Sequence, residues 1–294
     1  MNRLATLLGT HRPVLLDGAM GTLLQDSGLE DGAPGELWNL ENPEAIRAAH
    51  AAYAQVGARL LTTNTFGGTR PRLDMHGLGD RVGEVNRTAA QLARSVADER
   101  GLLVAGDLGP TGELLAPLGT LAPEEAQALF AEQLTGLVEG GIDLVLVETL
   151  SDLGEADAAI AAAREVAPDL PVVVTMSFDT NLRTMMGVRP GDAVAHLAAA
   201  GADAVGANCG RGPEEMELIA AEMVQARTGD LLLVAQSNAG LPQVVGDHFE
   251  YDASPGDLAA HATRLAALGV DLVGGCCGST PAHIAAMGAE LAPV

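Results

Sequence analysis

The sequence predicts a single-domain α/β protein of the (β/α)8 TIM-barrel class that spans residues 1–294. Three observations predict this fold. Eight short apolar runs alternate with eight alanine-rich amphipathic stretches, which is the pattern of repeated βα units. Four of the runs open with one motif, a glycine followed by a small or apolar residue and then a charged residue. The length of 294 residues suits a barrel, which uses about 250 residues as one domain.

The repeated motif predicts four of the eight strands. Its copies are GARLLTTN from Gly57, GIDLVLVE from Gly141, GADAVGAN from Gly201 and GVDLVGGC from Gly269. Each glycine is expected to end a helix in the left-handed conformation, and the run after it to form a buried strand. The seventh residue after each glycine has a functional side chain, and these residues are Asn64, Glu148, Asn208 and Cys276.

Four further apolar runs complete the predicted barrel. They are PVLLDGAMGT near Asp17, LLVAGDLGPTG near Asp107, PVVVTMSFDT near Ser177 and LLLVAQSNAG near Asn238. Helices are expected between the strands, several of them with proline in the first turn. The expected ranges are Pro43–Gln55, Asp80–Glu99, Pro123–Glu139, Gly154–Val166, Asp192–Ala200, Pro213–Ala226, Pro255–Leu268 and Pro281–Leu291. A doubly wound open sheet is the rival fold, but the chain has no GxGxxG motif or P-loop.

Three loops are expected to follow the first three strands. They cover Gln25–Leu40, Arg70–Leu78 and Gly109–Leu121. Loops after the strands of a barrel lie at its C-terminal mouth, where substrates bind. We therefore expect all three loops to lie near the substrate.

Composition excludes several classes of protein. The formal net charge of −23 argues against a nucleic-acid-binding surface. No run approaches 18 uninterrupted apolar residues and no secretion signal opens the chain, so we expect no membrane association. Cysteines are few and odd in number, which favours the reducing cytoplasm.

The three cysteines lie at the ends of two predicted strands. Cys209 is in VGANCGRG, and Cys276 and Cys277 are adjacent in VGGCCGSTPAHI. On a barrel these segments reach the same rim. Buried cysteines are often only small apolar residues. Because all the cysteines of the chain meet at this rim, we instead predict a zinc site with three thiolates and one exchangeable position.

The motifs together resemble the zinc-dependent homocysteine S-methyltransferase family. They are LDGAMGT, TTNTF, LGPTG, the VET of the fourth strand, GANCG, SNAGLP and GGCCGSTPAHI, in the order of the family from about Val14 to Leu291. DGAMGT and NAGLP are most similar to the homocysteine-binding domain of cobalamin-dependent methionine synthase. The resemblance implies that Cys209, Cys276 and Cys277 bind Zn²⁺ as the catalytic site, and that zinc binds the sulfur of homocysteine.

The resemblance also implies a fourth zinc ligand and a set of substrate contacts. Asn238 would fill the fourth position before substrate arrives; alternatively it holds the NAGLP turn, and water is the ligand. Asp17 and Glu148 would bind the α-ammonium group, unless each forms a structural ion pair. Backbone N–H groups are expected to bind the carboxylate, and they belong to Gly18, Ala19, Met20 and Gly21. Asn64, Thr65, Asn208 and Ser177 also end strands, where they either line the site or bond neighbouring loops.

The predicted function is transfer of a methyl group to the thiol of homocysteine, which forms methionine. The favoured donor is methylcobalamin carried by a separate corrinoid protein, because the chain has no cobalamin or folate module of its own. S-methylmethionine is the alternative donor. The betaine-dependent branch has a tyrosine where this chain has Thr149, which disfavours betaine. Two other hypotheses are a non-catalytic zinc-bearing subunit of a corrinoid methyltransferase complex and a metal-dependent hydrolase, although no histidine ends a strand.

Several conspicuous residues are expected to have ordinary roles. The run from Asp74 to Gly79 matches DxHxxG, a cobalamin-binding signature in which histidine ligates cobalt. Such a domain needs its own five-stranded unit, so His76 is not expected to bind a cofactor. Trp38 is expected to pack or to cover the site. The histidines of predicted helices are expected to be packing or surface residues, and they are His196, His261 and His283.

Overall fold

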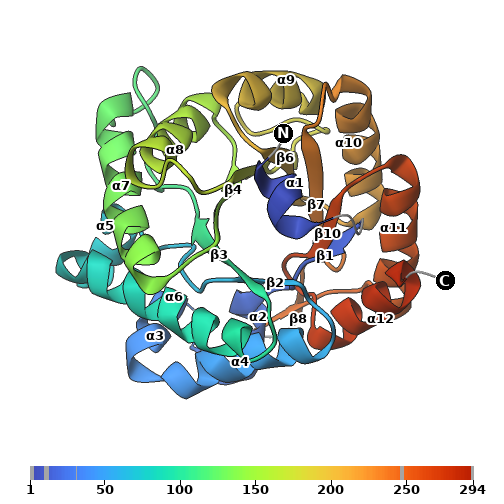
Figure 1. Ribbon diagram of the computed structural model, residues 1–294, viewed down its shortest axis with the longest axis horizontal. Coiled ribbons are helices and arrows are strands. Elements are labelled where there is room, and N and C mark those ends of the chain that lie inside the picture. Colours follow the sequence, from blue (N-terminus) through green and yellow to red (C-terminus); the bar gives the residue numbers. More distant parts are fainter. Residues whose placement is uncertain (1–2, 10–12, 31, 246–247, 293–294) are drawn as a thin grey trace.

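The computed structural model describes residues 3–9, 13–30, 32–245 and 248–292. Eight parallel strands form one sheet in the order β1-β10-β7-β6-β5-β4-β3-β2, and the sheet curls into a ring (Figure 1). The strands are β1 (Val14–Leu15), β2 (Leu60–Thr62), β3 (Leu103–Leu108), β4 (Leu144–Leu150), β5 (Val172–Met176), β6 (Ala204–Cys209), β7 (Leu232–Ser237) and β10 (Leu272–Gly275). The predicted (β/α)8 barrel is therefore confirmed.

The barrel closes between β1 and β2 through two hydrogen bonds. The backbone N–H of Arg59 donates to the carbonyl of Leu15 at 2.9 Å. Three residues further along the chain, the N–H of Thr62 donates to Oδ2 of Asp17 at 2.6 Å. A carboxylate thus stands in for a backbone carbonyl at this seam.

Helices form the outer ring of the barrel (Figure 1). They are α4 (Pro43–Gln55), α6 (Val82–Asp98), α7 (Pro123–Gly140), α8 (Leu153–Val166), α9 (Pro190–Ala200), α10 (Pro213–Ala226), α11 (Pro255–Leu268) and α12 (Pro281–Leu291). All eight predicted helices are present, four with the predicted bounds. Three of the motif glycines end their helices in the left-handed conformation, namely Gly141, Gly201 and Gly269.

Several short elements differ from the expectations. The segment Arg70–Leu78, expected as a loop, contains α5 (Arg70–Asp74), and the short helix η2 (Gly79–Arg81) precedes α6. The expected loop Gln25–Leu40 contains the end of α2 (Met20–Asp26), η1 (Gly35–Leu37) and the start of α3 (Trp38–Glu41). No prediction covered α1 (Arg3–Leu8) or the antiparallel pair β8 (Gln243–Val245) and β9 (His248–Glu250). Elements of three to seven residues are too short to show a hydrophobic period.

The third residue of the repeated motif holds the bottom of the barrel together. Asp143, just before β4, accepts a hydrogen bond from the N–H of Val104 in the preceding strand at 2.8 Å and forms an ion pair with Arg94. The same arrangement recurs with Asp203, Val172 and Arg164, and with Asp271, Leu233 and Arg227. Each aspartate thus links its own strand to the strand before it in the sequence. It also binds an arginine in, or directly after, the helix that leads into that earlier strand.

Helix α1 closes the same end of the barrel, over the ring of strands in Figure 1. Leu4 is fully buried and packs with the first residues of several strands, among them Val14, Leu60 and Leu144. A larger apolar core fills the space between the sheet and the outer helices. In the described ranges, no helix combines the length and the apolar character needed to cross a bilayer.

Candidate active site

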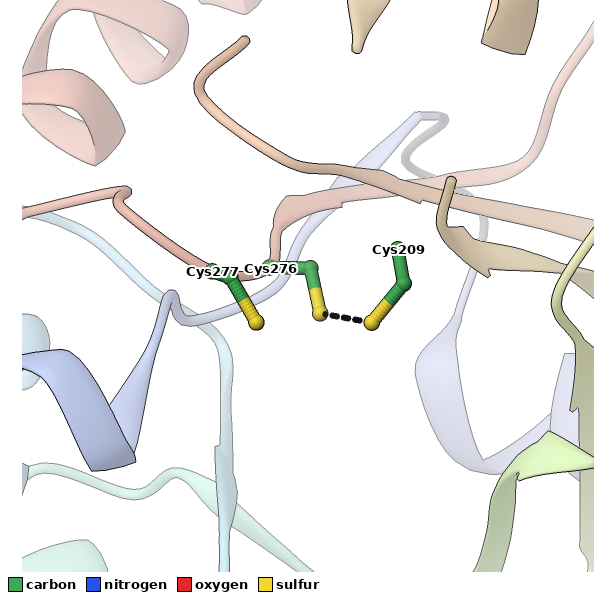
Figure 2. A group of neighbouring side chains, drawn as sticks. All are labelled: Cys209, Cys276 and Cys277. Atoms are coloured by element: carbon green, nitrogen blue, oxygen red, sulfur yellow. Dashed lines mark hydrogen bonds between the residues drawn. The ribbon is translucent and has the colours of Figure 1, made fainter. Parts of the chain in front are cut away.

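Three thiols meet at the C-terminal end of the barrel. Cys209 is the last residue of β6, and Cys276 and Cys277 follow directly after β10. Their Sγ atoms all lie within 4.8 Å of one another, and the three side chains converge (Figure 2). Cys209 and Cys276 are 3.0 Å apart at sulfur, and all three cysteines are free. The predicted cluster therefore forms, and it could hold a metal ion.

Strand β7, which lies between β6 and β10, fixes the backbone of the cluster. The N–H of Cys276 donates to the carbonyl of Ser237 at 2.8 Å, and the carbonyl of Cys277 accepts from Ala239 at 2.9 Å. Cys209 has a φ of 59°, a left-handed conformation that is uncommon for a residue with a side chain. This turn of the chain ends β6 and presents the thiol at the rim.

Asn208 is fully buried beneath the thiols. Its Oδ1 accepts from the N–H of Thr149 at 2.9 Å and from the hydroxyl of Thr175 at 2.8 Å. Its Nδ2 donates to the hydroxyl of Thr149 at 2.6 Å and faces the sulfurs of Cys209 and Cys276 at 3.6 and 3.9 Å. Asn208 thus connects β4, β5 and β6 to the cluster.

The proximity of the thiols splits their acidities. Hydrogen bonds from Cys209 and Cys276 lower the pKa of Cys277 to about 3, against a smaller opposing effect of burial. Hydrogen bonds with Cys209 and Cys277 raise the pKa of Cys276 well above the ordinary value. The pKa of Cys209 is also raised well above the ordinary value.

A cavity of about 460 Å³ opens beside the thiols. Three cysteines form part of its wall, and the ends of the first strands and the loop before α3 form the rest. Four carboxylates line it, namely Asp17, Glu36, Asp107 and Glu148, whereas Arg72 and His76 are the basic side chains among the described lining residues. The cavity therefore favours a positively charged group.

Glu148 offers a carboxylate without a partner. Burial, followed by the charges of Cys277 and Asp17, raises the pKa of Glu148 to about 8. Among the described residues, no ion pair or hydrogen bond engages this carboxylate. Asp17 differs, because its two oxygens accept from the N–H and the hydroxyl of Thr62. Burial raises its pKa to about 6.

Asp107 was not predicted as a site residue. It is 2% exposed and its Oδ1 accepts no hydrogen bond from the described residues. Burial, then the charges of Glu148, Glu36 and Asp17, raise its pKa well above the ordinary value. The sequence contained the same signal as for Asp17, a carboxylate at the end of an apolar run. Glu36, whose Oε1 accepts from the N–H of Gly67 at 2.5 Å, lies in η1, in a segment expected as a loop, and gave no such signal.

The remaining predicted substrate contacts divide into two groups. Asn64, Thr65 and the segment Gly18–Gly21 line the cavity. In that segment the N–H of Ala19 already donates to Oγ of Ser279 at 3.0 Å, and Nδ2 of Asn64 bonds the neighbouring loop at the carbonyl of Gly35. Asn208 and Ser177 are not among the described residues that line the cavity, nor is any residue of the loop Gly109–Leu121.

Asn238 lies between the two cysteine segments. Its Nδ2 donates to the carbonyl of Gly210, the residue after Cys209, at 2.8 Å. Its Oδ1 is buried and accepts no hydrogen bond from the part of the chain that the structure describes. An unpartnered amide oxygen at this position is compatible with a fourth metal ligand.

Trp38 and the histidines singled out in the sequence have different surroundings. Trp38 packs in a small apolar cluster with Leu24 and Ile46. His76 is exposed and lies at the cavity wall. His196 is exposed beside Asp157, whereas two other histidines are buried, and these are His261 and His283.

Comparison with known proteins agrees with this geometry. The sequence profile of the family described as homocysteine S-methyltransferase matches residues 14–291. Methionine synthase of Mycobacterium leprae is 34% identical over 96% of this chain, and that of Mycobacterium tuberculosis is 34% identical over 97%. The chain spans about a quarter of the length of these relatives, 24% and 25% respectively.

Solved structures of the homocysteine methyltransferase MmuM from Escherichia coli share the fold over their whole length. The metallated form superposes with a TM-score of 0.82 at 28% identity and covers 98% of this chain. The oxidised form gives 0.80 and the apo form 0.76, both at 27% identity. The carboxyl transferase domain of Rhizobium etli pyruvate carboxylase, at 16% identity and a TM-score of 0.53, shares the fold alone. The chain therefore belongs to the homocysteine S-methyltransferase family.

Proposed function

We propose that this protein transfers a methyl group to the thiol of homocysteine and so makes methionine, with Zn²⁺ bound by the three cysteines. One observation carries the proposal: three thiols converge at a cavity whose wall also contains four carboxylates. A thiol substrate with an ammonium group needs both features. The thiols provide a metal site for its sulfur, and the carboxylates attract its charge.

The residues present suit zinc. Three cysteine thiolates with one open position form a known type of catalytic zinc site. The three Sγ atoms lie within 4.8 Å of one another, with those of Cys209 and Cys276 3.0 Å apart, so all three would be within reach of one ion. The unpartnered Oδ1 of Asn238 supports its assignment as the ligand at rest. When bound, Zn²⁺ would hold the homocysteine sulfur as a thiolate at neutral pH.

Side chains of the cavity would orient the amino acid. Glu148 and Asp107 are partnerless carboxylates that line the cavity, and we assign them to the α-ammonium group. Asp17 keeps its bonds to Thr62 and adds negative charge at the same wall. Backbone N–H groups of Met20 and Gly21, at the start of α2, are assigned to the carboxylate.

The transfer itself is a displacement at the methyl carbon. The homocysteine thiolate forms the new S–C bond, and the donor departs with the electron pair of the bond that breaks. The chain contributes orientation, which can supply much of the rate of such a reaction.

We propose methylcobalamin, carried by a separate corrinoid protein, as the donor. The support is the similarity to methionine synthases, at 34% identity. S-methylmethionine is the second candidate, and a specific observation favours it. Its permanently charged sulfonium would be attracted by the four carboxylates of the cavity.

An isolated-protein assay tests the proposal. Purified zinc-loaded protein is incubated with homocysteine and each of methylcobalamin, S-methylmethionine and betaine, and methionine is quantified. Methionine from one donor supports the proposal and identifies the donor. No methionine from any donor, with zinc and homocysteine both bound, would make the chain a zinc-bearing scaffold. We assign the reaction to the cytoplasm, where the three free cysteines stay reduced.

A further inference from the structure

A second cavity opens at the bottom of the barrel, at the end opposite the thiols. It has a volume of about 500 Å³ and lies between the starts of β1 and β3 and the end of α12. Arg59 is the charged side chain among its described lining residues. The others are apolar side chains and glycines, among them Leu8, Val56 and Gly288. A cavity of this size and character is suited to a small, largely apolar molecule.

The repeated motif shows what is unusual about Arg59. In three of its four copies the third residue is an aspartate, and in the first copy it is Arg59. The N–H of Asp143 donates to the carbonyl of Val104 at 2.8 Å, and its carboxylate accepts from the N–H of Val104 at 2.8 Å. The same two bonds recur in the other aspartate copies, at Asp203 with Val172 and at Asp271 with Leu233.

The seam between β1 and β2 has only one of these two bonds. The N–H of Arg59 donates to the carbonyl of Leu15 at 2.9 Å. The N–H groups of Val14 and Leu16 donate to carbonyls on the β10 side. Because these directions alternate along a strand, the N–H of Leu15 points towards β2, where the first copy has no aspartate to accept it.

The unmatched donors at this seam lie together at the cavity. Leu15 is 7% exposed, and its N–H donates to no residue in the described part of the chain. Buried backbone N–H groups are nearly always paired. Arg59 forms no ion pair with any described residue. Both residues line the cavity, which therefore presents two donors of hydrogen bonds and a positive charge.

We propose that this cavity binds a small carboxylic acid with an apolar body, in its ionised form. In the three aspartate copies, one carboxylate is shared between a backbone N–H and an arginine. The first copy has the N–H of Leu15 and the guanidinium of Arg59 and lacks the carboxylate. A ligand carboxylate would accept from both in charge-assisted hydrogen bonds, and its apolar body would pack against the cavity wall.

Calorimetry with octanoate tests the recognition of the carboxylate. Octanol has the same chain without the charge, and it should bind the parent more weakly than octanoate does. Arg59→Gln should weaken octanoate binding on the order of fivefold, because Arg59 is exposed and an exposed ion pair contributes modestly. Arg183→Gln is the matched control and should bind octanoate like the parent. It removes an equal charge from the loop after β5, where Arg183 donates to the carbonyl of Gly187 at 3.2 Å.

Arg59→Asp supplies the absent carboxylate from the chain itself. The new side chain should accept from the N–H of Leu15, as Asp143 does from Val104, and should exclude octanoate. Hydrogen exchange resolved to single amides measures this. The Leu15 amide should exchange about fivefold more slowly in octanoate-bound parent than in free parent. It should be equally slow in Arg59→Asp without ligand, and octanoate should not slow it further.

Several outcomes would overturn the proposal. One is a parent protein that does not bind octanoate. Octanol that binds as tightly as octanoate, or an Arg59→Gln variant that binds octanoate like the parent, would show that the carboxylate is not recognised. Bound octanoate that leaves the exchange of the Leu15 amide unchanged would place the ligand elsewhere. Calorimetry with Arg59→Gln still decides the matter if Arg59→Asp does not fold, and none of these measurements depends on zinc or homocysteine.

Discussion

The side-chain amide of Asn208 is joined to Thr149 by two hydrogen bonds, from the N–H of Thr149 at 2.9 Å and to its hydroxyl at 2.6 Å. Each member of this pair is adjacent in sequence to a residue of the candidate site. Thr149 follows Glu148 and has a φ of 63°, while Cys209 follows Asn208 and has a φ of 59°. One buried contact therefore sets the positions of the Glu148 carboxylate and the Cys209 thiol together.

Asn208→Ala should weaken metal binding as well as the fold. It leaves the N–H of Thr149 and the hydroxyl of Thr175 unpaired, which costs about 1–3 kcal/mol, and zinc affinity should fall about 10- to 100-fold. Denaturant unfolding and chelator competition measure the two effects. Asn86→Ala is the control, because buried Asn86 bonds the carbonyls of Gly68 and Val82 away from the thiols. Equal loss of zinc affinity in the control would contradict the prediction.

Zinc binding should release about two protons per chain near pH 7.5. Hydrogen bonds from its two thiol neighbours lower the pKa of Cys277, whereas the pKa values of Cys209 and Cys276 are raised well above the ordinary value. Three thiolate ligands therefore require about two further ionisations, and affinity should fall as pH falls. Calorimetry in buffers of different ionisation enthalpy counts the protons.

Cys276→Ser should lose the metal; full zinc in that variant would refute the three-cysteine site.

Glu148→Gln should impair homocysteine binding and spare the metal. Loss of a charged hydrogen bond worth about 1.5–3 kcal/mol weakens affinity about tenfold to a hundredfold. Titration of zinc-loaded protein with homocysteine measures the change. Glu155→Gln is the matched control, since this buried carboxylate accepts from Thr111 and lies outside the cavity. Unchanged homocysteine affinity in Glu148→Gln would assign Glu148 a structural role.

Asp107→Asn should stabilise the metal-free protein at high pH. Burial and three neighbouring carboxylates raise the pKa of Asp107 in the folded state. The folded protein keeps this proton after the unfolded chain has lost it, so stability falls as pH rises from about 4 through the folded pKa. The variant has no carboxylate to ionise at this position and so does not lose this stability. The difference in free energy of unfolding between variant and parent should therefore grow from pH 5 to pH 8. Denaturant unfolding across this range would refute the prediction if the difference stayed constant.

His50→Leu should reduce acid sensitivity. His50 is fully buried, and neither of its ring nitrogens forms a hydrogen bond with any described residue. Burial lowers its pKa to about 4. Stability is intact above the unfolded pKa of about 6.5 and is lost as pH falls towards 4, by up to about 3 kcal/mol. The free energy of unfolding of the variant, measured by denaturant unfolding, should exceed that of the parent by more at pH 5 than at pH 7.5. An equal difference at both values would show that only packing changed.

Sequence reasoning found the barrel because the same unit is repeated. The glycine motif, proline helix starts and apolar runs each predict the same boundaries, and α10 and α11 agree with their expected bounds. It found the thiol cluster because parallel strands end on one side of a barrel, whatever their separation along the chain. Cys209 and Cys276 are 67 residues apart in sequence and 3.0 Å apart at sulfur.

Contacts made by irregular segments could not be predicted in this way. The ring of Tyr251 packs against Gly278, next to Cys277, from the stretch after β9, and Glu36 reaches the cavity from η1. Neither position follows from a period, because the path of such a segment depends on the surfaces it crosses. Asn208 shows a different limit. Its place at a strand end was foreseen, but the pleat turns its side chain under the thiols, into contact with Thr149.

Each aspartate at the bottom of the barrel lies a fixed number of residues before a site residue at the top. Asp143, Asp203 and Asp271 each precede a reactive strand end by five residues, at Glu148, Asn208 and Cys276. At about 3.3 Å per residue these ends lie about 17 Å along their strands from the anchors. Lengthening any of these strands by one residue would turn its reactive side chain to the opposite face. Evolution and engineering can therefore remodel the mouth loops for a new donor, provided that these three distances stay unchanged.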